Sequence, residues 1–177
     1  MEYFDVLDEN GYKTGKTKLR QDVHRDGDWH RGISVYIVNS KGDVLLQKRS
    51  QNVDKYPNMW NVSSGGHVDA GEDSITTAIR EVKEELGVDI TEEQLELLYT
   101  TKSSYIPKPG FIENEIIDVY LVKADIKVED VILQKEEVSD VKYIAIKEFR
   151  DMIERRDKDL IIYPDMNRLI LALEEKI

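Results

Sequence analysis

The chain shows two spacings of apolar residues, one typical of strands and the other typical of helices. Runs rich in β-branched and aromatic residues predict strands, at residues 3–7, 33–38, 44–47, 59–62, 65–68, 95–102, 111–122 and 141–146. Apolar residues at intervals of three and four predict helices, over about 74–86 and 147–155 and then from near Pro164 onward. Polar runs between these segments predict loops, among them 50–58 and 103–110.

The order of these elements predicts the fold class. Strands, one helix, more strands and then helices are typical of a mixed sheet flanked by helices, which is an α/β fold of the α/β/α sandwich type. A length of 177 residues fits a single domain over 1–177. Residues 13–19 show no clear period and residues 22–32 predict an irregular segment, so residues 1–30 are interpreted as an N-terminal lead-in. Residues 147–177 hold the C-terminal helices.

Composition narrows the class of protein. The net charge is −11 and there is no cysteine, which disfavours binding to a nucleic acid polymer and excludes disulfides and thiolate metal sites. No apolar run approaches the roughly 18 residues of a membrane span. The N-terminus lacks the basic segment and apolar core of a signal peptide, so a cytoplasmic protein without a membrane partner is expected.

The helix expected over 74–86 has two different faces. Its acidic residues Glu81, Glu84 and Glu85 recur at i, i+3 and i+4 and therefore share one face. The opposite face is an apolar stripe, made of Ile75, Ile79, Val82 and Leu86. Such an acidic face is commonly only solvated, but three adjacent carboxylates also suit a divalent cation, because Mg²⁺ prefers oxygen ligands.

The surroundings of this helix resemble the Nudix box. Nine specified positions match the box without a gap: Gly66, Glu72, Arg80, Glu81, Val82, Glu84, Glu85, Gly87 and Val88. The resemblance implies a Nudix-like α/β/α sandwich with a mixed sheet and the catalytic helix packed beside it. It also implies that Glu81, Glu84 and Glu85 hold Mg²⁺ or Mn²⁺, that a backbone carbonyl near Gly66 adds a ligand, and that Glu72 and Arg80 pair and orient the site.

The reaction implied by the resemblance is metal-assisted hydrolysis of a diphosphate linkage. The substrate would be a small molecule, either a nucleoside diphosphate derivative or a related organic diphosphate. An extra ligand or base is expected from outside the helix. In the strand that begins at Phe111, Glu113 and Glu115 share a face with an apolar row, so they mark either an exposed strand end or the mouth of a core.

A second resemblance covers roughly residues 20–120. His24, His30 and His67, together with Glu113 and Glu115, resemble the metal-binding residues of type I isopentenyl diphosphate isomerases, which share the Nudix fold. The run Leu45–Ser50, Pro57 and Trp60 also match that branch. The resemblance implies a second metal at the histidines, where imidazole and carboxylate suit Mn, Zn or Fe.

Two departures from the isomerases favour a hydrolase. The isomerase cysteine that lies two residues before the histidine is replaced here by Gly65, and the Nudix box is complete, whereas the isomerases have a degraded version. Isomerase-type activity and a non-catalytic nucleotide-binding regulatory domain are the alternatives. Candidate cations for the substrate phosphates are Arg20, Lys48, Arg49 and Lys55, although each would also serve as an ordinary surface charge. A homodimer is left open.

Overall fold

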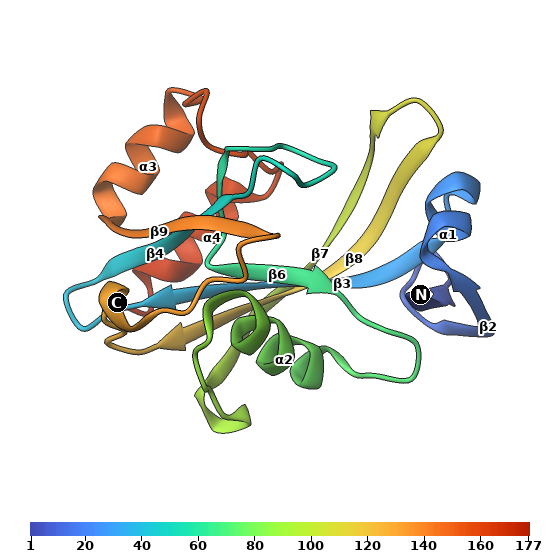
Figure 1. Cartoon of the computed structure of the whole chain (residues 1–177), viewed down its shortest axis with the longest axis horizontal. Coiled ribbons are helices and arrows are strands. Elements are labelled where there is room, and N and C mark those ends of the chain that lie inside the picture. Colours follow the sequence, from blue (N-terminus) through green and yellow to red (C-terminus); the bar gives the residue numbers. More distant parts are fainter.

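Strand β3 (Trp29–Val38) lies at the centre of a nine-stranded mixed sheet in the computed structural model, which describes residues 1–177 (Figure 1). Its partners are strands on both of its edges: β1 (Tyr3–Leu7), β4 (Asp43–Arg49), β6 (Ser64–His67) and β8 (Phe111–Lys123). The remaining strands extend the sheet outward: β2 (Lys13–Leu19) pairs with β1, β5 (Trp60–Asn61) and β9 (Val138–Ala145) pair with β4, and β7 (Leu95–Lys108) pairs with β8.

The pairing of β3 with β8 is parallel, whereas β3 pairs with β6 in the antiparallel sense. In this register His30 lies beside Glu115, and Gly32 lies beside His67. Residues from three distant parts of the sequence therefore meet at the first half of β3.

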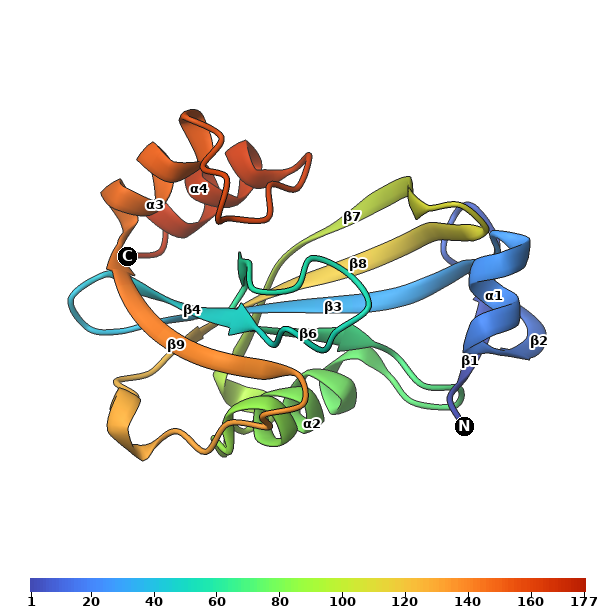
Figure 2. The same cartoon turned by 45° about the horizontal axis from the view of Figure 1, so that its top comes forward.

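Helices cover both faces of the sheet (Figure 2). On one face lies α2 (Ser74–Leu86), whose Ala78, Val82 and Leu86 pack on alternate residues of β3. On the other face lie α3 (Ile146–Glu154) and α4 (Met166–Glu174). Their apolar side chains contact the opposite set of sheet residues, among them Tyr36 and Val38. This arrangement confirms the predicted α/β/α sandwich with α2 packed beside the sheet.

Short single turns complete the chain, at Glu92–Gln94 (η1) and Val128–Asp130 (η2). Every helix falls short of the length and apolar character that crossing a membrane requires.

The N-terminal segment differs from the irregular lead-in that the sequence predicts. Residues 13–19 form β2, an edge strand with no buried face, so its sequence shows no alternation. Residues 20–26 form a short helix, α1 (Arg20–Asp26), which ends at Gly27 with φ 71°. Only Val23 and His24 of α1 are buried, which is too few for a helical period to appear.

The hairpin of β7 and β8 is longer than expected. The sequence predicts a loop from 103 to 110 because Pro107 and Pro109 resist pairing. In the structure β7 continues to Lys108, and the register shifts between Tyr105 and Lys108. The irregularity places Pro107 outside the regular ladder, so the hairpin extends beyond the rest of the sheet (Figure 1).

Candidate active site and metal centre

Helix α2 begins and ends at residues with well-defined capping contacts. The Asp73 side chain accepts a hydrogen bond from the backbone N–H of Thr76 at 2.7 Å, and Gly87 closes the helix with φ 66°. These caps fix the register of the helix, and its apolar stripe fixes its rotation on the sheet. Consequently all three glutamates line a cavity, with Glu81 and Glu85 largely or fully buried and Glu84 half exposed.

Glu85 is the most buried of the three helix carboxylates. Its side chain accepts hydrogen bonds at Oε2 from Gln47 Nε2 (2.9 Å), Ser64 Oγ (2.6 Å) and the backbone N–H of Gly65 (3.2 Å). Burial raises the pKa of Glu85 to about 8, and these hydrogen bonds offset only part of the effect. A negative charge at Glu85 is therefore costly until a cation approaches it.

Gly66 lets the backbone of β6 approach the Glu81 side chain. A Cβ at position 66 would overlap the Glu81 carboxyl group, so only glycine fits this contact. Burial raises the pKa of Glu81 to about 7 as well. The two raised pKa values show that these neighbouring carboxylates lack sufficient positive charge.

Arg80 is the cation that binds this group directly. Its guanidinium donates to Glu81 (2.9 Å), Glu84 (3.2 Å) and Glu72 (3.2 Å). Glu72 also accepts a hydrogen bond from the Thr77 hydroxyl at 2.8 Å. One guanidinium therefore links the loop before α2 to two carboxylates on the helix and fixes their orientation.

A second group of ligating side chains lies beside the first. It comprises His24 of α1, His30 of β3, His67 of β6, and Glu113 and Glu115 of β8. Ligand atoms of the three histidines and of Glu113 all lie within 4.8 Å of one another. We call these five residues the histidine cluster.

The Nε2 atoms of the histidine cluster converge on the two glutamates. His24 Nε2 is 2.9 Å from Glu113 Oε1, and His67 Nε2 is 3.1 Å from Glu115 Oε1. His30 Nε2 is 4.0 Å from Glu115 Oε1. All three Nε2 atoms are buried and none makes a well-aligned hydrogen bond. Buried nitrogen atoms that lack partners, facing carboxylates, suit a transition-metal ion.

Backbone carbonyls orient two of the rings. The Nδ1 atom of His24 lies 2.8 Å from the carbonyl oxygen of Arg20, and Nδ1 of His30 lies 3.1 Å from that of Asp28. A carbonyl accepts only, so Nδ1 of both rings donates to it, and both Nε2 atoms face the carboxylates. Burial lowers the pKa of His30 to about 4, which also keeps that ring neutral.

The glutamates of the histidine cluster have the opposite electrostatics to those of α2. Although burial opposes their charge, contacts with His24 and His67 lower the pKa of Glu113, and contacts with His67 lower that of Glu115. In return these carboxylates raise the pKa of His67 against the effect of burial. The histidine cluster therefore carries its own compensating charge.

Aromatic side chains pack around the rings. Phe4 of β1 stacks on His30 with ring centroids 5.3 Å apart and on His67 at 5.0 Å, while Phe111 stacks on His24 at 4.2 Å. Sequence reasoning missed the role of Phe4, although its place in an alternating strand marked it as buried. It also missed the contact of Gln47 with Glu85, although Gln47 lies in the run Leu45–Ser50 that matches the isomerase branch.

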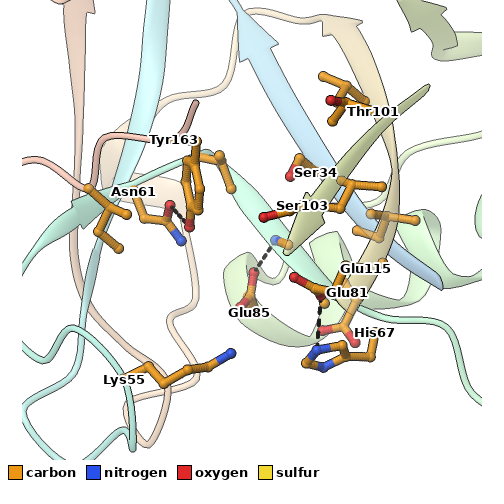
Figure 3. Close-up of a pocket in the computed structure, with 18 of the residues that line it drawn as sticks. Ser34, Lys55, Asn61, His67, Glu81, Glu85, Thr101, Ser103, Glu115 and Tyr163 are labelled. Carbon is orange, nitrogen blue, oxygen red and sulfur yellow. Dashed lines mark hydrogen bonds and ion pairs between the residues drawn. The ribbon is translucent and has the colours of Figure 1, made fainter. Parts of the chain in front are cut away.

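One cavity of about 310 Å³ joins the two groups (Figure 3). Its walls include Glu81 and Glu85 on one side and Glu115 and His67 beside them, as Figure 3 shows. Other polar and aromatic residues that line it are Ser34, Asn61, Tyr99, Thr101, Ser103, Tyr105 and Tyr163.

Three of the four cations expected at the cavity line it. Arg20 pairs there with Glu2 at 2.7 Å, and Arg49 Nε donates to the carbonyl oxygen of Lys55 at 2.9 Å. Lys48 does not line the cavity, because alternation along β4 directs it to the other face, where its ammonium lies 5.9 Å from the Trp60 ring centroid.

Comparison with known proteins gives a consistent result. A family model described as NUDIX domain matches residues 28–163. The chain is 44% identical over 170 residues to Nudix hydrolase 3 of Arabidopsis thaliana, an alignment that covers 94% of the chain and only 22% of that longer relative. It is also 31% identical over 159 residues to isopentenyl-diphosphate Delta-isomerase 1 of Photorhabdus laumondii, covering 89% of the chain and 88% of the relative.

The fold agrees with a solved crystal structure as well. A Deinococcus radiodurans protein superimposes with a TM-score of 0.70 at 23% identity, over 97% of this chain and 99% of that one. At this identity the likeness supports the fold alone.

Proposed function

The chain belongs to the Nudix hydrolase family, and from this premise we propose that it cleaves a diphosphate linkage in a small organic diphosphate with the help of divalent metal. The substrate class proposed is a nucleoside diphosphate derivative or a related compound. The observation that carries the proposal is the pair of buried helix carboxylates, Glu81 and Glu85, which face the cavity with raised pKa values.

We propose that Glu81, Glu84 and Glu85 hold Mg²⁺ or Mn²⁺, with the Gly66 carbonyl as a further ligand. The insufficient positive charge around these carboxylates supports this, because a divalent cation would relieve it. When bound, the metal would supply charge to bind the diphosphate and would acidify the attacking water. Arg80 and Glu72 are proposed to orient the carboxylates through the contacts already described.

The histidine cluster is the proposed second metal site, with ligands from His24, His30, His67, Glu113 and Glu115. Support comes from three buried Nε2 atoms without hydrogen-bond partners and from two backbone carbonyls that fix the tautomer. Imidazole with carboxylate suits Mn, Zn or Fe.

Glu115 has a further proposed role in catalysis. It lines the cavity beside Glu81 (Figure 3), and its lowered pKa keeps it charged at neutral pH. A charged carboxylate in this place accepts a hydrogen bond from the attacking water and orients it. For the substrate phosphates we propose Arg20, Arg49 and Lys55, since all three line the cavity, whereas Lys48 does not.

Isomerase activity is the second candidate, favoured by the 31% identity to an isopentenyl-diphosphate Delta-isomerase. The residue at position 65, a glycine, argues against isomerase activity. The backbone N–H of Gly65 holds Glu85, and a Cβ there would lie 3.2 Å from the Ile33 carbonyl oxygen and 3.3 Å from a Val62 methyl group. The site therefore has little room for the side chain that an isomerase cysteine would require.

We further propose that residues 1–177 form one domain, because one sheet includes strands from β1 to β9. A homodimer stays a prediction, which light scattering after size-exclusion chromatography would test.

The decisive experiment is a product-identifying assay with Mg²⁺ or Mn²⁺. The substrates are nucleotide sugars, dinucleoside polyphosphates, nucleoside di- and triphosphates and prenyl diphosphates. We expect at least one to yield two phosphorylated products, or one such product together with phosphate or pyrophosphate. Deuterium exchange from solvent into isopentenyl diphosphate would instead support an isomerase. Tight nucleotide binding without turnover would support a regulatory domain.

A further inference from the structure

Lys55 makes the closest contact between the histidine cluster and a side chain outside it. Its ammonium lies 2.8 Å from Oε1 and 2.7 Å from Oε2 of Glu113. The Glu113 side chain is 0% exposed and that of Lys55 is 16% exposed. A fully buried carboxylate is thus bound through both oxygens by a cation that still reaches solvent.

The lysine enters this site from a loop, residues 50–59, between β4 and β5. Arg49, at the end of β4, donates from Nε to the carbonyl oxygen of Lys55 at 2.9 Å, so the base of the side chain is held in place. Figure 3 shows the side chain of Lys55 reaching from this loop into the cavity. Because only its long tail is buried, the ammonium can change partners without movement of the loop.

Charge balance indicates when this change would occur. Glu113 and Glu115 carry two negative charges, which Lys55 and the neighbouring His67 face at contact distance. A divalent cation bound by the histidines would neutralise both carboxylates by itself. Lys55 would then be a surplus positive charge beside a metal ion, and like charges in a partly buried site repel strongly.

We propose that Lys55 is the resident cation of the histidine cluster and that a divalent metal displaces its ammonium from Glu113 toward the substrate diphosphate. The first half needs only the histidine cluster, whereas the destination of the ammonium rests on the proposed function. Lys55 already lines the cavity together with Arg20 and Arg49. The released ammonium therefore stays within the space that a diphosphate would occupy, and substrate cations become complete only when metal is bound.

Titration calorimetry with Mn²⁺ alone tests the first half. Lys55→Met removes the competing charge, so one Mn²⁺ should bind about tenfold more tightly than in the wild type. The control is Lys123→Met, which changes an exposed lysine at the end of β8. This variant should bind every Mn²⁺ with the affinity of the wild type. His67→Asn should weaken the binding of the same Mn²⁺ that Lys55→Met tightens. Unchanged or weaker Mn²⁺ binding in Lys55→Met, or tightening of a Mn²⁺ whose affinity His67→Asn leaves unchanged, would overturn the proposal.

Thermal unfolding gives a second readout that needs no catalysis. Without metal, Lys55→Met leaves Glu113 without its ammonium partner and should unfold at a lower temperature than the wild type. Saturating Mn²⁺ should abolish this difference. If the variant is unfolded without metal, its refolding with Mn²⁺ carries the same information. A deficit that is equally large with and without Mn²⁺ would contradict displacement.

The destination of the ammonium is tested with methylene diphosphonate, a diphosphate analogue without the hydrolysable anhydride oxygen. We expect Mn²⁺-loaded Lys55→Met to bind it about tenfold more weakly than the wild type, and the metal-free proteins to bind it with equal, low affinity. Equal binding by the two Mn²⁺-loaded proteins would overturn this destination. The measurement does not depend on turnover, so it separates failure of this inference from failure of the proposed hydrolase activity.

Discussion

The carboxylates of α2 and those of the histidine cluster lie in one cavity but differ in how they are built and charged. Glu81 and Glu85 come from a single turn of helix and have raised pKa values, because burial is not matched by enough positive charge. Glu113 and Glu115 come from β8 and have lowered pKa values, because histidines from other elements and Lys55 surround them. Burial alone therefore does not set the state of a carboxylate in this site, since the neighbouring cations decide it.

The largest expected effect concerns Glu85. Replacing Glu85 with Gln keeps the volume and removes the charge that a metal on α2 requires. We expect kcat/KM to fall about a thousandfold, equivalent to about 4 kcal/mol of transition-state stabilisation. Steady-state kinetics on the best substrate would measure it, with the exposed Glu92→Gln as the control. Full activity in Glu85→Gln would sink the assignment of α2 as the catalytic helix.

The histidine cluster should respond more mildly. His67→Asn removes one of three converging nitrogen ligands. We expect the affinity for the Mn²⁺ at the histidine cluster to fall about 10- to 100-fold, while the affinity for the Mn²⁺ at α2 stays unchanged. Calorimetry would measure both sites. If both Mn²⁺ affinities fall together, the two groups act as one site and the contrast between them fails.

A substitution between the two groups tests the approach of β6 to α2. Gly66→Ala places a methyl group where the Glu81 carboxyl group now lies. The displaced carboxylate should cost about tenfold in kcat/KM, since small misplacements in a catalytic site are expensive. Circular dichroism would confirm that the variant is folded. Wild-type kinetics in folded Gly66→Ala would show that this close approach has no function.

The smallest effect should appear in the pH dependence of stability without metal. The raised pKa of Glu85, about 8 against 4.5 in the unfolded chain, contributes stability below about pH 4.5 that is lost as the pH rises toward 8. The lowered pKa values of Glu113 and Glu115 act in the opposite sense, but their contribution is already complete above about pH 5. The lowered pKa of His30, about 4 against 6.5, adds stability up to about pH 6.5. We therefore expect the melting temperature to fall by about 4 °C between pH 6.5 and 8.

Two comparisons isolate Glu85 in that measurement. Glu85→Gln should lose the larger part of the decline, because an amide does not ionise in this range, and the rest belongs to Glu81, whose pKa is raised to about 7. Saturating Mn²⁺ should abolish the decline in the wild type, because the metal compensates the negative charge of Glu85. A decline of equal size in Glu85→Gln would assign it to other groups.

The bounds of α2 and the face that its glutamates share could be predicted from the sequence. Local spacing predicted α2 over 74–86, as observed, and placed Glu81, Glu84 and Glu85 on one face. The histidines and glutamates of the cluster were recognised only through resemblance, because their proximity depends on the register that pairs His30 with Glu115. Local spacing contains no information on that register.

Other features left no signal at all. The polar edge strand β2 and the short helix α1 expose most of their residues, so no period marks them. The contact of Lys55 with Glu113 joins a loop to a distant strand, and its residues look like ordinary surface charges in the sequence. Lys48 and Lys55 could not be ranked without the structure, because the place of Lys55 depends on the path of the loop after β4, which brings it to Glu113.

The parallel pairing of β3 with β8 also has a consequence for folding kinetics. It brings together residues as distant in the chain as Trp29 and Asn114, and pairings of such high contact order form slowly because a long loop must close first. Helix α2 meets β6 through contacts of shorter sequence separation, such as that of Glu85 with Gly65, which are 20 residues apart. During refolding we therefore expect the capacity to bind a metal through α2 to precede the capacity of the histidines, so that the order in which ions are captured would record the order in which the sheet is assembled.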